Sequence, residues 1–140
     1  MMLIDTNVLS ETRRRQPNQN VQRWLKQHSA ADLYLSSLVI AEIEAGIANT
    51  RDEATAEAVR IWLEGTVLPE FAGRILPFTV AEARMFGRWS GAGTRDGQPV
   101  AVVDAQIAAT AFVHGLSVVT RNSVDFLRFP VRVINPWEVS

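Results

Sequence analysis

Short apolar runs alternate along the chain with longer segments in which apolar residues recur every three or four positions. The short runs predict five buried strands, at residues 1–4, 33–35, 74–78, 116–120 and 131–134. The longer segments predict helices at 6–14, from Asn18 or Asn20, at 38–48, at 52–65, from Thr79 and at 100–113. Strands that alternate with helices favour an α/β sandwich around a mostly parallel sheet.

The starts of several predicted helices carry capping residues. Asp5 can cap the first helix, and the Ser36-Ser37 pair can cap the third. Thr79 and Glu82 have the spacing of a capping box, in which each side chain satisfies a backbone amide at the start of the helix. These signals support the helical assignments independently of the apolar period.

Two further segments are assigned from their composition. Residues 90–99 are rich in glycine and end in proline, so they predict a loop. The helix at 100–113 is apolar on all sides, which predicts that it is buried. On the helix at 52–65, we predict an inner face made of Ala58, Ile61 and Trp62.

The composition limits the class of protein. A chain of 140 residues has the usual size of one domain, which we predict to span residues 1–140. With 47% hydrophobic and 21% charged residues, it is expected to fold rather than stay disordered. The absence of cysteine excludes disulfides, thiolate catalysis and zinc ribbons. No apolar run could span a bilayer, and no signal peptide precedes the first strand, so we expect no membrane association and a cytoplasmic location.

Three carboxylates stand in apolar surroundings. Asp5 ends the first apolar run, and Glu42 and Asp104 lie inside apolar helical segments far downstream. A buried carboxylate is costly unless it is paired or coordinates a metal, and few cations are placed to pair with all three. Acidic residues gathered from distant segments therefore suggest a divalent-metal site, and such a site suggests phosphate-ester chemistry.

Two of these carboxylates also have a simpler interpretation, whereas Glu42 is harder to explain without a functional role. Asp5 could serve only as a helix cap, and Asp104 lies where the helix dipole favours negative charge. Glu42 and Glu44 have similar neighbours, so the periodicity does not tell which one points inward. Taken together, the three acids favour a metal site more strongly than any one of them does, because each would otherwise be a buried carboxylate without compensation.

Polar groups at the ends of predicted strands complete the candidate site. In an α/β sheet, ligands bind beyond the carboxyl ends of the strands, where Asp5 and residues 120–122 are expected. Asn122 could hold a water or a carboxylate, whereas Asp125 could equally cap a short turn. Hydroxyl and amide groups suited to orienting carboxylates are those of Thr6, Asn7 and Thr120.

The motifs, taken in order, resemble those of the PIN-domain ribonucleases, specifically the VapC toxins of toxin–antitoxin pairs and the FitB-like group within them. They are Leu3-Ile4-Asp5-Thr6-Asn7-Val8-Leu9, Ile40-Ala41-Glu42-Ile43, Asp104-Ala105-Gln106-Ile107, Thr120-Arg121-Asn122 with Asp125-Phe126, and Ile134-Asn135-Pro136-Trp137-Glu138. The resemblance runs from end to end of the chain. It implies a PIN-like three-layer α/β/α sandwich with a short, mostly parallel central sheet.

The resemblance also implies a metal-dependent endoribonuclease. Asp5 and Asp104 would be direct ligands of Mg²⁺ or Mn²⁺, and Glu42 would bind a second ion or position water. Many relatives carry a fourth acid after the position of Thr120, where this chain has Asn122, so we assign that place to Asp125, with Asn122 as a water-mediated contact. Hydrolysis of the RNA phosphodiester would leave a 5′-phosphate and a 3′-hydroxyl.

The implied partners follow from the same resemblance. They are a cognate antitoxin of the VapB or FitA type, a second copy of the chain in a homodimer, the RNA substrate, and operator DNA reached only through the antitoxin. The alternative is a catalytically weak PIN-like binding module that acts through protein or nucleic-acid partners. A phosphotransfer domain using Asp5 is disfavoured, because Asn7 stands where a second aspartate is needed and the only lysine is Lys26.

Overall fold

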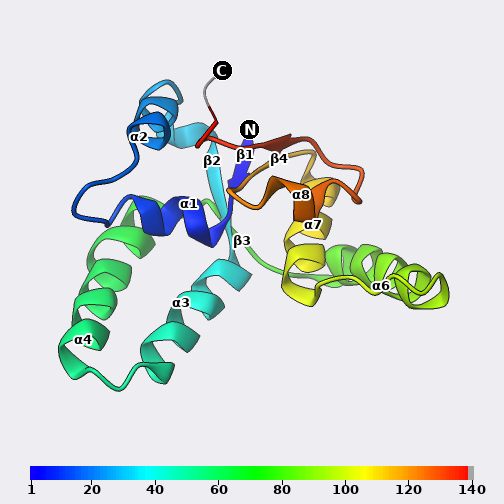
Figure 1. Cartoon of the computed structure of the whole chain (residues 1–140), viewed down its shortest axis with the longest axis horizontal. Coiled ribbons are helices and arrows are strands. Elements are labelled where there is room, and N and C mark those ends of the chain that lie inside the picture. The colour runs from blue at the N-terminus through cyan, green and yellow to red at the C-terminus, as the bar shows by residue number, and fades with distance from the viewer. Residues whose placement is uncertain (139–140) are drawn as a thin grey trace.

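The computed structural model of the protein describes residues 1–138 and has a mixed α/β architecture, as the sequence predicts (Figure 1). Within those residues, five parallel strands form one sheet in the order β3-β2-β1-β4-β5. The strands are β1 (Met2–Ile4), β2 (Leu33–Ser36), β3 (Ile75–Leu76), β4 (Ser117–Val119) and β5 (Val133–Ile134). The order reverses at β1, because the chain first adds β2 and β3 on one side and then returns to add β4 and β5 on the other.

Helices cover both faces of this sheet. They are α1 (Thr6–Glu11), α2 (Gln19–Lys26), α3 (Ser37–Asn49), α4 (Glu53–Trp62), α5 (Leu68–Glu70), α6 (Val80–Arg95), α7 (Val102–His114) and α8 (Ser123–Phe126), with a 3₁₀ turn at Ala30–Asp32 and a π-helical turn at Leu63–Val67. Side chains of β1 point alternately to its two faces, so Met2 and Ile4 enter one core and Leu3 the other. The first core receives side chains from α1 to α4, and the second from α7 and α8.

The predicted caps are present. Asp5 accepts a hydrogen bond from the Thr6 amide, Ser36 accepts one from the Leu38 amide at 3.1 Å, and Asn18 rather than Asn20 caps α2. These side chains satisfy amides that the first turn of a helix leaves without a partner. The helix starts were therefore readable from local sequence.

Two predicted helices end earlier than expected. The first stops at Glu11 instead of continuing to residue 14. The helix predicted at 52–65 corresponds to α4, which ends at Trp62 and is followed by the π-helical turn. Its predicted inner face is wrong in part, because Ala58 is exposed and Ile61 is 62% exposed. The residues of α4 that pack on the core are Ala56, Val59 and Trp62.

The loop predicted at residues 90–99 is largely helical. Helix α6 runs through this glycine-rich segment to Arg95, and Gly97, with φ +72°, follows its end. Gly93 is needed for packing, since a Cβ there would lie 2.7 Å from the carbonyl oxygen of Gln98. The glycine thus permits a close tertiary approach, which composition alone does not distinguish from a loop.

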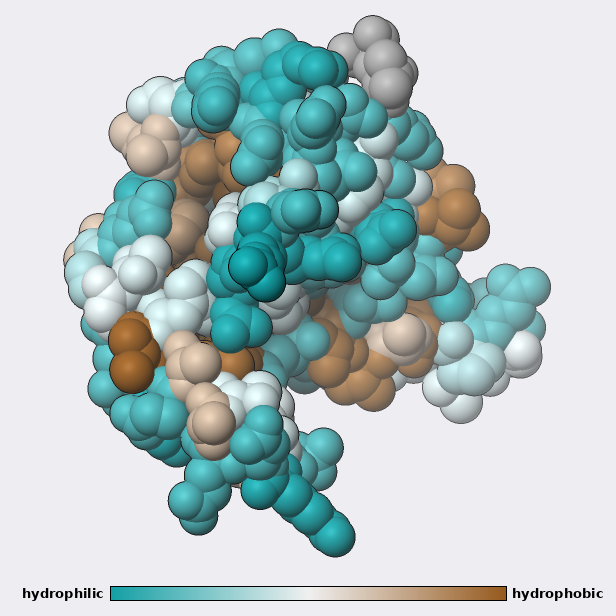
Figure 2. Space-filling view, turned by 60° about the vertical axis from the view of Figure 1, so that its left-hand side comes forward, coloured by the Kyte–Doolittle hydropathy of each residue, from teal (hydrophilic) through white to brown (hydrophobic). Residues whose placement is uncertain are grey.

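The surface of the molecule is mostly hydrophilic on the side shown in Figure 2, with hydrophobic side chains gathered in separate areas. The same view shows a hollow between helices α3 and α4 on one side and helix α6 on the other. Helix α7 is only partly buried, contrary to prediction, since its outer side exposes Val102, Val103, Phe112 and Val113. No helix within residues 1–138 combines the length and apolar character needed to cross a membrane.

Candidate active site

Asp5 stands directly after β1, where the strand order of the sheet reverses. The carboxyl ends of strands at such a point frame the crevice in which α/β proteins bind ligands. The side chain is only 6% exposed. Its Oδ1 accepts a hydrogen bond from the Thr6 amide at 2.8 Å, and its Oδ2 accepts one from the Thr120 hydroxyl at 2.8 Å. Asp5 is therefore both the cap of α1 and a carboxylate held in one orientation at the sheet edge.

Thr120 and Asn7 connect β4 to the start of α1. The fully buried Thr120 hydroxyl accepts hydrogen bonds from the Asn7 amide at 3.2 Å and from the backbone amide of Asn122 at 3.1 Å. The side-chain Oδ1 of Asn7 in turn accepts from the Arg121 backbone amide at 3.1 Å, and Asn7 Nδ2 donates to Asp5 Oδ2 at 3.4 Å. The network joins two neighbouring strands at their carboxyl ends and leaves Asp5 little rotational freedom.

Glu42 reaches the same region from α3. The Thr6 hydroxyl donates a hydrogen bond to Glu42 Oε1 at 3.0 Å, and Thr6 immediately follows Asp5. The sequence left Glu42 and Glu44 equivalent, but Glu42 is the one that this contact brings to Asp5. The choice depends on how α3 packs beside α1, and that is tertiary information.

Asp104 lies in the first turn of α7, and Asp125 lies in α8. The negative charges of Asp5 and Asp125 both act on Asp104, so these carboxylates lie near one another in the folded chain. Asp104 is half-buried and Asp125 is exposed. Asp5 at the end of β1, Glu42 of α3 and Asp104 of α7 thus lie in one region, and Asp125 of α8 lies near Asp104.

The pKa values of the three central carboxyls are raised. Burial raises the pKa of Asp5, against hydrogen bonds from Thr120 and Thr6 that lower it. Burial also raises the pKa of Glu42, where the Thr6 hydrogen bond lowers it and the charges of Asp5 and Asp104 raise it further. Burial is the main cause of the raised pKa of Asp104, and the charges of Asp5 and Asp125 raise it further. Such a site favours the uptake of positive charge, either a proton or a metal cation.

The donor set fits a hard divalent cation. Mg²⁺ takes oxygen ligands, and it is usually bound through one or two carboxylates while it keeps several waters. Within residues 1–138, no three acidic, histidine or cysteine side chains converge closely enough to ligate one ion by themselves. The described residues therefore do not form a fully protein-made cage, and a cation bound here would keep several waters.

Asn122 differs from the other predicted site residues. Its backbone amide donates to Thr120, while the residue as a whole is exposed at the start of α8. Its neighbour Arg121 is also exposed, and the Arg121 guanidinium lies 5.2 Å from the centre of the Trp137 ring. The sequence did not predict this stacking, because nothing local to Arg121 indicates that the chain end returns beside it.

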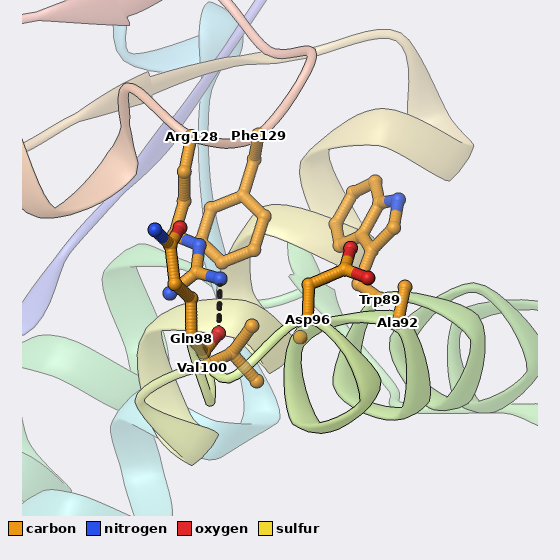
Figure 3. Close-up of a pocket in the computed structure, with 8 residues that line it drawn as sticks. Trp89, Ala92, Asp96, Gln98, Val100, Arg128 and Phe129 are labelled. Carbon is orange, nitrogen blue, oxygen red and sulfur yellow. Dashed lines mark hydrogen bonds between the residues drawn. The ribbon is translucent and has the colours of Figure 1, made fainter.

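A separate cavity of about 180 Å³ lies at the end of α6 (Figure 3). Figure 3 shows the Arg128 guanidinium pointing at the carbonyl of Gln98, to which its Nη2 donates at 2.6 Å. Nη1 donates to the Pro99 carbonyl at 3.1 Å, and the Phe129 ring stacks on Trp89 with centroids 5.0 Å apart. These contacts hold α6 and the α6–α7 connection against the segment that follows α8, so we interpret this cavity as structural.

The sequence and the fold both match known proteins. A family model described as the PIN domain matches residues 2–131. The chain is 40% identical over 137 residues to Toxin FitB of Neisseria gonorrhoeae, a match that covers 98% of this chain and 99% of that protein. It is 36% identical over 138 residues to VapC ribonuclease Y4jK of Sinorhizobium fredii, covering 99% of each.

Solved structures agree with these matches over nearly the whole chain. FitAcB from Neisseria gonorrhoeae superimposes with a TM-score of 0.89 at 40% identity, covering 99% of this chain and 100% of that one. FitAB bound to an IR36 DNA fragment gives a TM-score of 0.89 at 38% identity, covering 100% of this chain and 98% of that one.

Proposed function

The chain belongs to the PIN-domain family, and from this we propose that it is the toxin of a toxin–antitoxin pair that acts as a metal-dependent endoribonuclease. The observation that supports the chemistry most directly is that Asp5, Glu42 and Asp104 act on one another near the end of β1 and each have a raised pKa. A group of acids that disfavour one another's ionisation is costly to the fold. Binding of a cation to these oxygens would offset that cost and supply the metal that the proposed reaction needs.

In the proposed mechanism, Asp5 and Asp104 hold the cation, and Glu42 holds a second cation or the attacking water. When bound, Mg²⁺ or Mn²⁺ supplies Lewis-acid polarisation of the phosphodiester and lowers the pKa of a bound water. Thr120 and Asn7 keep Asp5 oriented, and Thr6 does the same for Glu42. Preorganised ligands need no rearrangement when the substrate binds.

We assign the fourth acid to Asp125, whose charge acts on Asp104. Asn122 is neutral and contributes a backbone amide to Thr120. Asp125→Asn is therefore expected to lower the cleavage rate more than Asn122→Ala. Single-turnover cleavage by the two variants at saturating Mn²⁺ measures the difference, and the opposite ranking would move the fourth position to Asn122.

We also propose a cognate antitoxin of the FitA or VapB type and a homodimer of this chain. The support is the match at about 40% identity to FitAcB and to FitAB bound to DNA. Operator DNA would be contacted through the antitoxin. Co-expression with the protein encoded beside the toxin, followed by light scattering of the purified material, tests both statements. A monomer that co-purifies with no partner contradicts them.

The test of the activity is cleavage of total cellular RNA by purified protein with Mg²⁺ or Mn²⁺, compared with the same reaction in EDTA. Asp5→Asn and Asp104→Asn are expected to abolish cleavage. Glu57→Gln is the matched control, because Glu57 is an exposed carboxylate that pairs with Arg60 on the same helix.

Cleavage that depends on metal and on both aspartates, but not on Glu57, supports the proposal. New ends that carry a 5′-phosphate would agree with attack by a metal-activated water. Cleavage that persists in EDTA, or in Asp5→Asn, would contradict it and point to a contaminating nuclease. No cleavage under any condition would favour a binding module.

A further inference from the structure

A cavity of about 310 Å³ lies between α2 and the chain segment that follows β5. Figure 1 shows the C-terminal end of the described chain beside α2. The two walls come from opposite ends of the sequence, and the Asn20 amide joins them by donating to the Trp137 carbonyl at 2.9 Å. The cavity is thus a feature of the tertiary structure, with no counterpart in any local motif.

The rim of this cavity is hydrogen-bonded to the catalytic edge of the sheet. The Thr120 amide donates to the Ile134 carbonyl at 3.0 Å, and Thr120 also donates to Asp5. One residue on, the Asn135 side chain donates to the Arg121 carbonyl at 3.2 Å. Since Ile134 and Asn135 line the cavity, Thr120 connects the cavity to Asp5 through two hydrogen bonds.

The walls combine an aromatic ring with polar side chains. The half-buried Trp24 ring packs on His28 with centroids 4.2 Å apart, so it is held in place. Gln27 and Arg23 are exposed on the same helix and carry amide and guanidinium groups. Unpaired RNA bases are recognised by stacking on aromatic or guanidinium planes and by hydrogen bonds to their edges.

Resting on the proposed ribonuclease function, we propose that this cavity binds one unpaired nucleobase of the RNA next to the cleaved phosphodiester. The Arg121 backbone bonds to both regions, since its amide donates to Asn7 Oδ1 and its carbonyl accepts from Asn135. Its guanidinium lies over Trp137, and we assign it to the phosphate that joins the bound base to the cleaved bond. Asn135 is occupied by Arg121 and by the Trp137 amide, which donates to it at 2.9 Å. Glu138 also lines the cavity, and its Oε1 accepts from Asn135 Nδ2 at 3.4 Å. Arg23 uses Nη1 to donate to Asn20 Oδ1 at 3.3 Å, which leaves its other guanidinium N–H groups for the ligand. The groups that read the base are then Gln27 and Arg23, with Trp24 as the stacking surface.

The experiment uses RNA oligonucleotides centred on the cleavage site of the wild-type protein, each with one abasic position. Binding is measured by fluorescence anisotropy to Asp5→Asn protein, which leaves the RNA intact. One abasic position near the cleaved bond is expected to weaken binding by about tenfold. Adding Arg23→Ala and Gln27→Ala to the Asp5→Asn protein is expected to weaken binding of intact RNA similarly and to abolish the effect of that abasic position.

The matched control carries Gln22→Ala and Lys26→Ala, which remove the same kinds of side chain from another side of α2. It is expected to keep the abasic effect unchanged. If wild-type protein cuts RNA but the Arg23 and Gln27 substitutions leave the abasic effect intact, the base-binding role is overturned and the ribonuclease function stands. If wild-type protein cuts no RNA, the proposed function fails, and the base-binding role fails with it.

Discussion

Single hydroxyl groups control the orientation of the carboxylates in this site. Thr120 donates to Asp5, and Thr6 donates to Glu42. Both threonines were predicted to orient carboxylates from their positions at strand ends, but the sequence did not say which threonine serves which acid. That pairing depends on the packing of α3 beside α1 and of β4 beside β1.

Thr120→Val tests the role of one such hydroxyl. Valine has nearly the same shape, but it removes the donor to Asp5 and the acceptor used by Asn7 and Asn122. Loss of a group that orients a metal ligand usually lowers activity or metal affinity by about 10- to 100-fold. We expect a loss of that size in RNA cleavage and in Mn²⁺ affinity measured by calorimetry. Thr120→Ser should restore both, and equal loss in the serine variant would argue against the hydroxyl.

Gly93→Ala tests a close backbone approach. The new Cβ would lie 2.7 Å from the Gln98 carbonyl oxygen and 3.3 Å from Val100 Cγ1, so the α6–α7 connection must move. We expect a loss of about 1–3 kcal/mol in the free energy of unfolding, measured by urea denaturation. Gly87→Ala is the control on the same helix, where a Cβ meets nothing within 4 Å, and it should instead stabilise by up to about 1 kcal/mol.

At the scale of elements, Glu82 joins two helices. Its Oε2 accepts hydrogen bonds from the Thr79 amide at 2.8 Å and from the Thr79 hydroxyl, which completes the predicted capping box of α6. Its Oε1 lies 2.8 Å from His114 Nε2 at the end of α7. The sequence predicted the box but not the link to His114, because the two residues meet only when the helices pack.

The pH dependence of stability follows from this carboxylate. Burial alone would raise the pKa of Glu82, but the hydrogen bonds from Thr79, from backbone amides and from His114 lower it to about 2. A carboxyl whose pKa is lowered on folding stabilises the fold above its unfolded pKa, and that stability is lost as the pH falls toward the folded value. The contribution is therefore complete above about pH 4.5 and disappears near pH 2.

Glu82→Gln measures that contribution. We expect the variant to be less stable than wild type by about 2 kcal/mol at pH 7, with the difference shrinking between pH 4.5 and 2. Urea midpoints across this range give the profile. Glu57→Gln should change stability little at any pH, since its pair with Arg60 is exposed. A Glu82 effect that does not vary with pH would assign it to packing rather than to charge.

At the scale of the whole molecule, the site lies where the strand order reverses, with carboxylates supplied by helices from both sides of the sheet. The pKa of Asp104 is raised in this arrangement, mainly by burial and in addition by the charges of Asp5 and Asp125. A carboxyl whose pKa is raised on folding destabilises the fold once it ionises. In the metal-free protein, ionised Asp104 is therefore expected to lower the free energy of unfolding at neutral pH. The proposed metal binding, rather than stability, explains why a carboxylate stands there.

Asp104→Asn should remove part of this destabilisation. In EDTA at pH 7 we expect the variant to have a higher Tm than wild type, with the difference vanishing below the ordinary pKa of 3.8. With saturating Mg²⁺ the order should reverse, because ligand binding stabilises only the protein that retains the site. Thermal unfolding with and without the metal measures both effects. A variant less stable than wild type in EDTA would contradict this account.

Local pattern was enough to place every strand, the capped starts of α1, α2, α3 and α6, and Asp5 at the end of β1. These features depend on side-chain periodicity and on hydrogen bonds between residues a few positions apart. That residues 1–140 form one domain stays a prediction from chain length. The motifs also identified the acids of the candidate site, although their roles remain proposals.

Tertiary packing decided the rest. Glu42 is distinguished from Glu44 only by its contact with Thr6, which lies 36 positions away in the sequence. Gly91 and Gly93 belong to helix α6, and at Gly93 the Gln98 carbonyl approaches so closely that a Cβ would not fit. The cavity beside α2 forms where β5 and the segment after it pack against a helix from the first quarter of the sequence. Such contacts depend on which distant segments meet, and no pattern within a short window records that.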